Sequence, residues 1–164
     1  MIDPAYCSLL ARYNQWMNRK LYQSCGELTE AQCKQDVGAF FGSIQATLNH
    51  LLYADTIWTR RFTGRPLDGL HARMEFHPDL SALRAMRDIF DQEIIDWAGK
   101  VAQPWLAADF SYTRQADGVA VTRPAWVLVT HMFNHQTHHR GQITTMLKQF
   151  GLDPGVTDLA AMPL

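Results

Sequence analysis

The sequence predicts an all-α fold, specifically a four-helix bundle, from three observations. First, apolar residues recur at helical spacing in four long segments, 4–25, 43–63, 81–101 and 124–150. Second, residues typical of helix starts stand before these segments, and glycine closes three of them. Third, 164 residues with 47% hydrophobic side chains suit one domain, 1–164, with a sizeable core. Four such helices in one domain indicate a bundle.

The first long helix is expected to begin at Asp3 and Pro4, because aspartate caps a helix and proline suits its first turn. Gly26 ends it. Thr29 and Gln32 follow with the spacing of a capping box, which predicts a short turn of helix.

Ser43 is expected to cap the second long helix, and Gly64 to end it. The following residues, 64–79, contain two glycines and two prolines and are expected to form a loop. Ser81 is then expected to start the third helix. This long loop favours a bundle with crossover connections.

The connection before the fourth helix, 104–123, has a different pattern. Two extended runs flank Asp117 and Gly118, which predicts a small β-hairpin or other extended excursion. Pro124 is expected to begin the fourth helix and Gly151 to end it.

The charge balance is close to neutral, with 15 basic and 16 acidic residues and a net charge of -1. A protein that binds nucleic acid non-specifically usually has a basic excess, so no nucleic-acid partner is expected. No apolar run approaches the roughly 20 residues that a membrane helix needs, so no membrane association is expected. Cys7, Cys25 and Cys33 form no CxxC pair, and the N-terminus shows no signal-peptide pattern, so a reducing cytoplasm is expected.

Histidines are concentrated in the fourth helix, where four of the seven lie within residues 131–139. At about 100° per residue, His131 and His139 fall within about 40° of His135, and His138 within about 60°. Histidines four residues apart lie on successive turns and can share one metal ion. Both His131 with His135 and His135 with His139 satisfy this spacing.

His50 is the only histidine in another predicted helix, and it is the natural further ligand, since a catalytic metal site needs at least three. Ala46 and Ala54 stand one turn to either side and leave room for an ion. Two structural alternatives remain open: His50 as a hydrogen-bonded core residue, and the histidine cluster as a solvated or pH-responsive patch.

Three more residues are candidates near this site. Tyr53 and Gln142 are expected to border it and to orient a ligand or water, with ordinary packing as the alternative. Arg61 is a weaker candidate for binding an acidic group on a thiol cofactor, with a surface ion pair as the alternative.

Three stretches carry a resemblance to a known family. The run from His131 to Gln142, HMFNHQTHHRGQ, closely resembles the signature helix of the DinB/YfiT-like metalloenzymes, and residues 48–52 and 13–16 resemble its other signatures. The resemblance implies a four-helix bundle with a three-histidine site for a divalent ion such as nickel, zinc or iron. Carried over by position, the ligands are His50, His135 and His139, and His131 matches a family histidine that is not usually a ligand.

The resemblance also implies a reaction, because some relatives transfer low-molecular-weight thiols to electrophilic small molecules. No Asp or Glu lies on the histidine faces as an obvious base, which favours activation of a thiolate. Hydrolysis by a metal-bound water, a non-enzymatic metal-binding module and a metal-free structural bundle are the alternatives.

Assembly is suggested by Trp126, Phe133 and Leu147, which lie on the side of the fourth helix away from His135. Apolar residues on a second face need cover, either from the rest of the chain or from a partner. Because relatives are often homodimers, a homodimer is expected.

Overall fold

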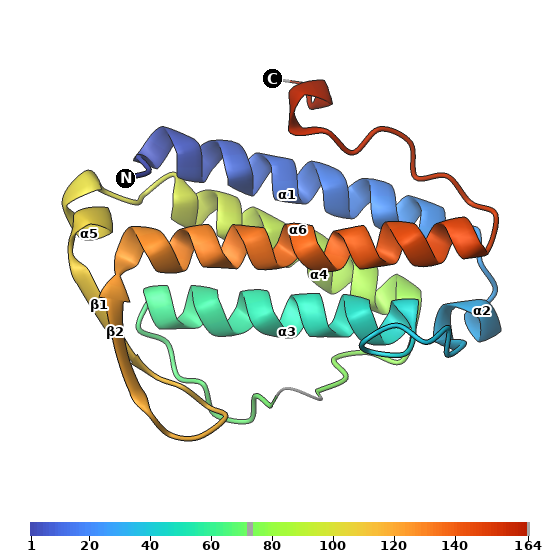
Figure 1. Cartoon of the computed structure of the whole chain (residues 1–164), viewed down its shortest axis with the longest axis horizontal. Helices are drawn as coiled ribbons and strands as arrows, with labels where there is room; N and C mark the ends of the chain where they lie inside the picture. The colour runs from blue at the N-terminus through green and yellow to red at the C-terminus, as the bar shows by residue number, and fades with distance from the viewer. Residues whose placement is uncertain (72–73, 164) are drawn as a thin grey trace.

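The structure is a computed structural model that describes residues 1–71 and 74–163. Its four long helices pack side by side as a bundle (Figure 1), which confirms the predicted fold class. They are α1 (Pro4–Cys25), α3 (Ile44–Phe62), α4 (Leu80–Ala98) and α6 (Ala125–Gln149).

Helices α1 and α3 lie on opposite corners of the bundle. Each of them packs against both α4 and α6. Helices α3 and α4 both run from the α2 end toward the hairpin end (Figure 1), so the connection 63–79 returns along the length of the bundle. The connection from α4 to α6 stays at one end.

The predicted starts of the first two long helices are confirmed. The carboxylate of Asp3 accepts a hydrogen bond from the backbone N–H of Tyr6 at 2.8 Å. Thr29 forms both bonds of a capping box with Gln32 at the start of the short helix α2 (Glu30–Lys34). The hydroxyl of Ser43 caps α3.

The predicted bounds of the third helix are corrected at both ends. Helix α4 begins at Leu80 because Asp79, not Ser81, is the N-cap: the Asp79 carboxylate accepts from the backbone of Ala82 at 2.8 Å. Ser81 instead donates its hydroxyl proton to Asp79. The helix ends at Ala98, before Gly99, and not near residue 101.

The predicted excursion before the fourth long helix is a two-stranded hairpin, with β1 (Asp109–Thr113) antiparallel to β2 (Ala120–Pro124). Pro124 is the N-cap of α6, which begins at Ala125. A short helix, α5 (Gln103–Ala107), precedes the hairpin and was not predicted, because one turn is too short to show helical periodicity.

The chain ends in an extended tail that lies along α1 (Figure 1) and carries one turn of 3-10 helix, Leu159–Ala161. The hydroxyl of Tyr13 donates to the backbone oxygen of Thr157 at 2.5 Å, and Lys20 donates to that of Val156. The tail therefore packs on the surface of α1.

The apolar core consists of two clusters, one toward each end of the bundle. The cluster at the hairpin end includes Trp58, Phe62, Ile94, Val129 and Phe133. The cluster at the α2 end includes Leu21, Leu48, Leu83, Ile143 and Leu147.

Between these clusters all four long helices contribute buried polar side chains. Arg87 lies at the centre and contacts Asp55 at 2.5 Å and Asp91 at 2.8 Å. The other members are amides or a second arginine: Asn14, Asn18, Gln136 and Arg140. Two carboxylates and two guanidinium groups balance in charge, which buried ions require. We call these seven residues the central polar layer.

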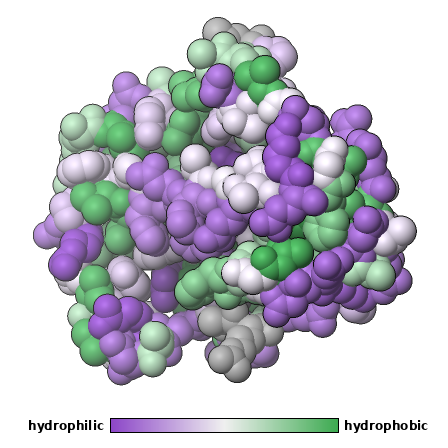
Figure 2. Space-filling model, turned by 45° about the vertical axis from the view of Figure 1, so that its right-hand side comes forward, coloured by the Kyte–Doolittle hydropathy of each residue, from purple (hydrophilic) through white to green (hydrophobic). Residues whose placement is uncertain are grey.

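The outer residues of the fourth long helix are covered by the chain itself. Phe133 and Leu147 are buried in the two core clusters, and Trp126 packs against the first of them. Figure 2 shows hydrophilic and hydrophobic residues interspersed on the face it presents. These three residues therefore give no support to the expected homodimer.

Within the described residues, no helix combines the length and the hydropathy needed to span a membrane.

Candidate metal centre

Three histidines from two helices converge beside the central polar layer. His135 and His139 lie on successive turns of α6, and His50 faces them from α3. The Nε2 atom of His135 lies 3.3 Å from Nε2 of His50 and 3.1 Å from Nε2 of His139. One ring nitrogen from each histidine falls within 4.8 Å of the other two.

Gln142 contacts the ring nitrogen of His139 that does not face His135. The amide oxygen of Gln142 lies 2.8 Å from Nδ1 of His139, and its amide nitrogen lies 3.3 Å from Nε2 of His138. Because an amide oxygen only accepts hydrogen bonds, Nδ1 of His139 carries the proton. In the neutral ring, Nε2 then presents its lone pair toward the other two histidines, which is the tautomer that a metal ligand needs.

The local environment keeps these imidazoles neutral. Burial, followed by the nearby His139, lowers the pKa of His50 to about 4. Burial, followed by His139 and His50, lowers the pKa of His135 to about 3. Burial also lowers the pKa of His139, although the hydrogen bond that its Nδ1–H donates to Gln142 opposes this shift. Neutral rings are the form in which histidine binds metal ions.

The donor set fits a divalent ion. Two nitrogens that bind a tetrahedral ion at about 2.1 Å lie about 3.4 Å apart, close to the two separations found here. Facing lone pairs repel each other unless a proton or a cation lies between them. The N–H of a neutral ring can bridge one pair of rings, whereas one divalent ion can bind all three Nε2 atoms at once. The buried Nδ1 atom of His50 has no hydrogen-bond partner within the described residues, and the ring is held instead by stacking on Phe41.

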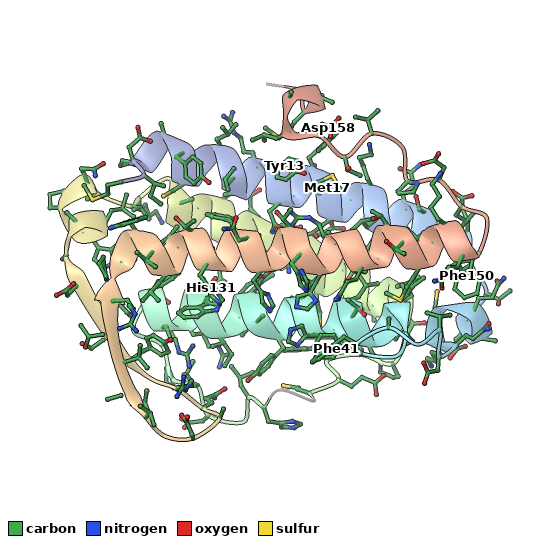
Figure 3. All side chains as sticks on the ribbon, in the orientation of Figure 1. Tyr13, Met17, Phe41, His131, Phe150 and Asp158 are labelled. Atoms are coloured by element: carbon green, nitrogen blue, oxygen red, sulfur yellow. The ribbon has the colours of Figure 1, made fainter. Side chains whose placement is uncertain are left out.

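The two other histidines of the motif do not join this group. His131 packs edge-on against Trp58 with ring centroids 5.2 Å apart, and its side chain faces the gap between α6 and α3 (Figure 3). His138 is exposed and contacts Gln142. The geometry therefore favours the pair His135 and His139 over the pair His131 and His135.

A loop before α3 covers one side of the three histidines. Phe41 from this loop lies beside α3 (Figure 3) and stacks on the ring of His50, with centroids 3.9 Å apart and planes 26° apart. A cavity of about 520 Å³ lies next to His50 and is lined by this loop and α3. Small molecules therefore have a space beside the histidines.

Tyr53 lies near the centre, as expected, with its ring centroid 6.2 Å from that of His50. Its hydroxyl donates to Gln115 at the hairpin tip at 2.7 Å, and Gln115 donates to the backbone of Leu70 at 3.4 Å. Tyr53 thus joins the hairpin to the 63–79 connection.

Arg61 lies beside the end of β1 that leads into the hairpin turn. Its guanidinium stacks over the rings of Trp58 and Tyr112 and donates to the backbone oxygen of Thr113 at 3.1 Å. It forms no ion pair with any described carboxylate. Its contacts attach the hairpin to α3, and a role in cofactor binding stays a prediction.

The sequence reasoning missed two parts of the site: Phe41 and the central polar layer. Gln136 and Arg140 of that layer are adjacent in sequence to His135 and His139, so the layer and the centre share one section of α6. The available signal was a charged residue one turn from apolar residues on its own helix, such as Asp55 near Leu51 or Arg140 near Ile143, because buried charges need partners from neighbouring helices.

Known proteins resemble this chain over nearly its whole length. The family model described as "DinB family" matches residues 1–163. The chain is also similar to the protein described as "Protein DinB" from Bacillus subtilis (strain 168), with 28% identity over 155 residues, which cover 91% of this chain and 88% of the relative.

Proposed function

We propose that this chain, which belongs to the DinB family and brings three imidazoles together, is a divalent-metal-dependent enzyme. The enzyme activates a low-molecular-weight thiol for transfer to an electrophilic small molecule. His50, His135 and His139 are the proposed ligands, and nickel, zinc and iron are the proposed ions. The convergence of the three Nε2 atoms is the observation that supports the proposal.

A divalent ion held there supplies Lewis-acid chemistry and lowers the pKa of a thiol or water in its open positions. The protein's own residues do the rest. Helices α3 and α6 hold the three rings at fixed separations, and Gln142 fixes the tautomer of His139. Three protein ligands leave further positions free, as in catalytic zinc sites.

Thiol activation is favoured because no described carboxylate lies among the three ligand atoms as a general base. Asp55, in the adjacent polar layer, is bound by Arg87 and by Gln136 at 2.6 Å. A thiol bound to a cation loses its proton without a strong base, whereas attack by water commonly uses one.

Hydrolysis is the second candidate, and one observation favours it. Glu75 lines the same cavity as His50 and brings a carboxylate to its wall. A non-enzymatic metal-binding protein is the third candidate, expected to hold the ion without turnover.

The ligand set is tested by metal analysis of single alanine variants purified with added zinc or nickel. We expect His50→Ala, His135→Ala and His139→Ala each to lose the ion and His131→Ala to keep it. Metal loss in His131→Ala with retention in His139→Ala would show that the ligand assignment is wrong.

The reaction is tested by incubating the metal-loaded protein with cysteine, glutathione or coenzyme A and chlorodinitrobenzene, and separately with nitrophenyl acetate. Thiol transfer that chelation abolishes supports the proposal. Metal-dependent ester cleavage that Glu75→Gln abolishes supports hydrolysis instead. Bound metal with neither activity supports the non-enzymatic candidate.

The cellular setting is also proposed. A reducing cytoplasm is consistent with Cys7, Cys25 and Cys33, which are all free and buried. A homodimer rests on the family resemblance and the net charge of -1, which provides little repulsion between copies. Light scattering tests it, because a mass near the 18.7 kDa of one chain would refute it. No nucleic-acid partner is proposed.

A further inference from the structure

We propose that the cavity beside His50 binds the acceptor substrate by an uncharged aromatic or apolar group, and that Phe40 determines this specificity. The role assigned to the cavity rests on the proposed function, whereas its preference for apolar ligands rests on its own lining. The proposal depends on three features: a constrained loop, an exposed aromatic ring, and polar lining groups that already have partners.

The loop that carries Phe40 is closed by its own backbone. The N–H of Val37 donates to the carbonyl of Gly42 at 2.9 Å, and the N–H of Gly42 donates to that of Ala39 at 2.8 Å. Gly38 and Gly42 take φ values of +75° and +78°, which other residues rarely adopt. The loop therefore presents its side chains from a defined backbone.

Two aromatic rings project from this loop at the cavity. Phe41 covers the ring of His50, and Phe40 packs edge-on against Phe41 with centroids 4.9 Å apart. Phe40 is 82% exposed and lines the 520 Å³ cavity and, on its other side, a hollow of about 280 Å³ along α6. A phenyl ring at this position offers an open face to a ligand that enters beside His50.

The two amide side chains of the cavity, Gln45 and Asn49, are already engaged. Gln45 donates to the backbone oxygen of His77 at 2.9 Å. Asn49 donates to the same oxygen at 3.3 Å and accepts from the backbone of Phe76 at 2.7 Å. These amides hold the 76–77 backbone against α3 and have few free sites for a polar ligand.

The charges around the cavity disfavour an anion. Lys34 lines the cavity, but its ammonium group is paired with Glu30 at 2.6 Å. Glu75, on the same cavity, forms no ion pair with a described residue. The available surface is therefore the rings of Phe40 and Phe41 together with the apolar side chains of Ala46 and Met74, which suits a neutral, planar group.

The test is an NMR titration of the isotope-labelled, metal-free protein with neutral fluoronaphthylmethanol and its anionic analogue fluoronaphthoate. The fluorine signal of each probe gives its Kd, and the amide signals of the protein locate the site. Loss of one ring face removes on the order of 40 Å² of apolar contact, so Phe40→Ala is expected to raise the Kd of the neutral probe about fivefold. Ile89→Ala is the matched control, because Ile89 is another exposed apolar side chain, 73% exposed, on α4.

We expect the neutral probe to bind more tightly than the anion and to shift amide signals only in residues 36–50 and 74–77. The Kd of the neutral probe should rise in Phe40→Ala and stay unchanged in Ile89→Ala. Equal binding of both probes, an unchanged Kd in Phe40→Ala, or shifts elsewhere would overturn the proposal. Because the titration uses no metal, its failure is distinct from failure of the proposed function, which metal analysis tests separately. Metal content of Phe40→Ala should equal that of the unmodified protein.

Discussion

Replacing Gln142 by alanine is expected to weaken metal binding without disturbing the fold. Gln142 would act on the ion through its 2.8 Å hydrogen bond to Nδ1 of His139. Without that acceptor, the ring is free to rotate and to place its proton on Nε2, where it blocks the ion. Loss of such a supporting residue typically reduces metal affinity by about 10–100-fold.

This loss converts into a measurable change in thermal stability. With free zinc at about 100 times the Kd of the unmodified protein, bound zinc adds about 2.7 kcal/mol to the free energy of unfolding. A Kd raised about tenfold lowers that contribution to about 1.4 kcal/mol, and a Kd raised about 100-fold lowers it to about 0.4 kcal/mol. At about 2–4 °C per kcal/mol, the zinc-induced rise in Tm falls from about 5–11 °C to at most about 6 °C.

The assay is differential scanning fluorimetry with zinc buffered by a chelator, and it includes two matched variants. Gln142→Glu keeps an acceptor for Nδ1 and is expected to retain the zinc-induced rise. His138→Ala removes the contact to the Gln142 amide nitrogen and an edge-on ring contact with His139, but it leaves the acceptor for Nδ1 in place and is expected to change the rise little. A full zinc response in Gln142→Ala, or a weaker response in Gln142→Glu than in Gln142→Ala, would refute the reasoning.

Three further outcomes are expected. Chelation should lower Tm but leave the helical circular dichroism signal, because both core clusters are apolar and do not depend on the ion; loss of helix would contradict this. Arg87→Met should lower the free energy of unfolding in urea by about 3–5 kcal/mol, because it leaves the buried carboxylates of Asp55 and Asp91 unpaired. Arg84 is exposed, so Arg84→Met should change that free energy by no more than about 0.5 kcal/mol. Similar losses in both variants would show that the central polar layer contributes little. The metal-free protein should be most stable above about pH 6.5 and should lose stability as the pH falls toward 4 and 3. Folding lowers the pKa of His50 to about 4 and that of His135 to about 3, so the unfolded chain binds more protons than the folded chain across this range. Thermal melts from pH 7.5 to 4.5 check the sign, and His135→Gln should show a shallower slope; equal slopes would count against the assignment.

Local signals in the sequence determined the helices and much of their boundaries. Asp3, Thr29 and Ser43 cap where their side chains predict, because capping depends only on residues within one turn. The same locality explains the error at α4, where Asp79 and Ser81 both suit a helix start. The aspartate bonds to the backbone of Ala82, and the serine bonds to the aspartate.

The sequence by itself narrowed the candidate ligands to His50, His135 and one of two neighbours of His135, since i, i+4 spacing places both His131 and His139 beside it. The family resemblance chose His139 over His131, and the structure brings the chosen three together. What the spacing left open was the competing pair, because His131 is equally far from His135 along the helix. Only the position of α3 against α6 distinguishes them, by placing Trp58 beside His131 and His50 beside His139.

Only the tertiary structure decided how charged and apolar surfaces are buried. The central polar layer needs α1, α3, α4 and α6 together, so no single helix pattern predicts that Arg87 contacts Asp55 and Asp91. Judged from the pattern of α6 alone, Phe133 and Leu147 form an apolar face without cover. In the structure that helix lies between α1 and α3, which cover two of its sides, and both residues are buried. Periodicity reports one helix at a time, whereas burial and charge pairing depend on which helices become neighbours.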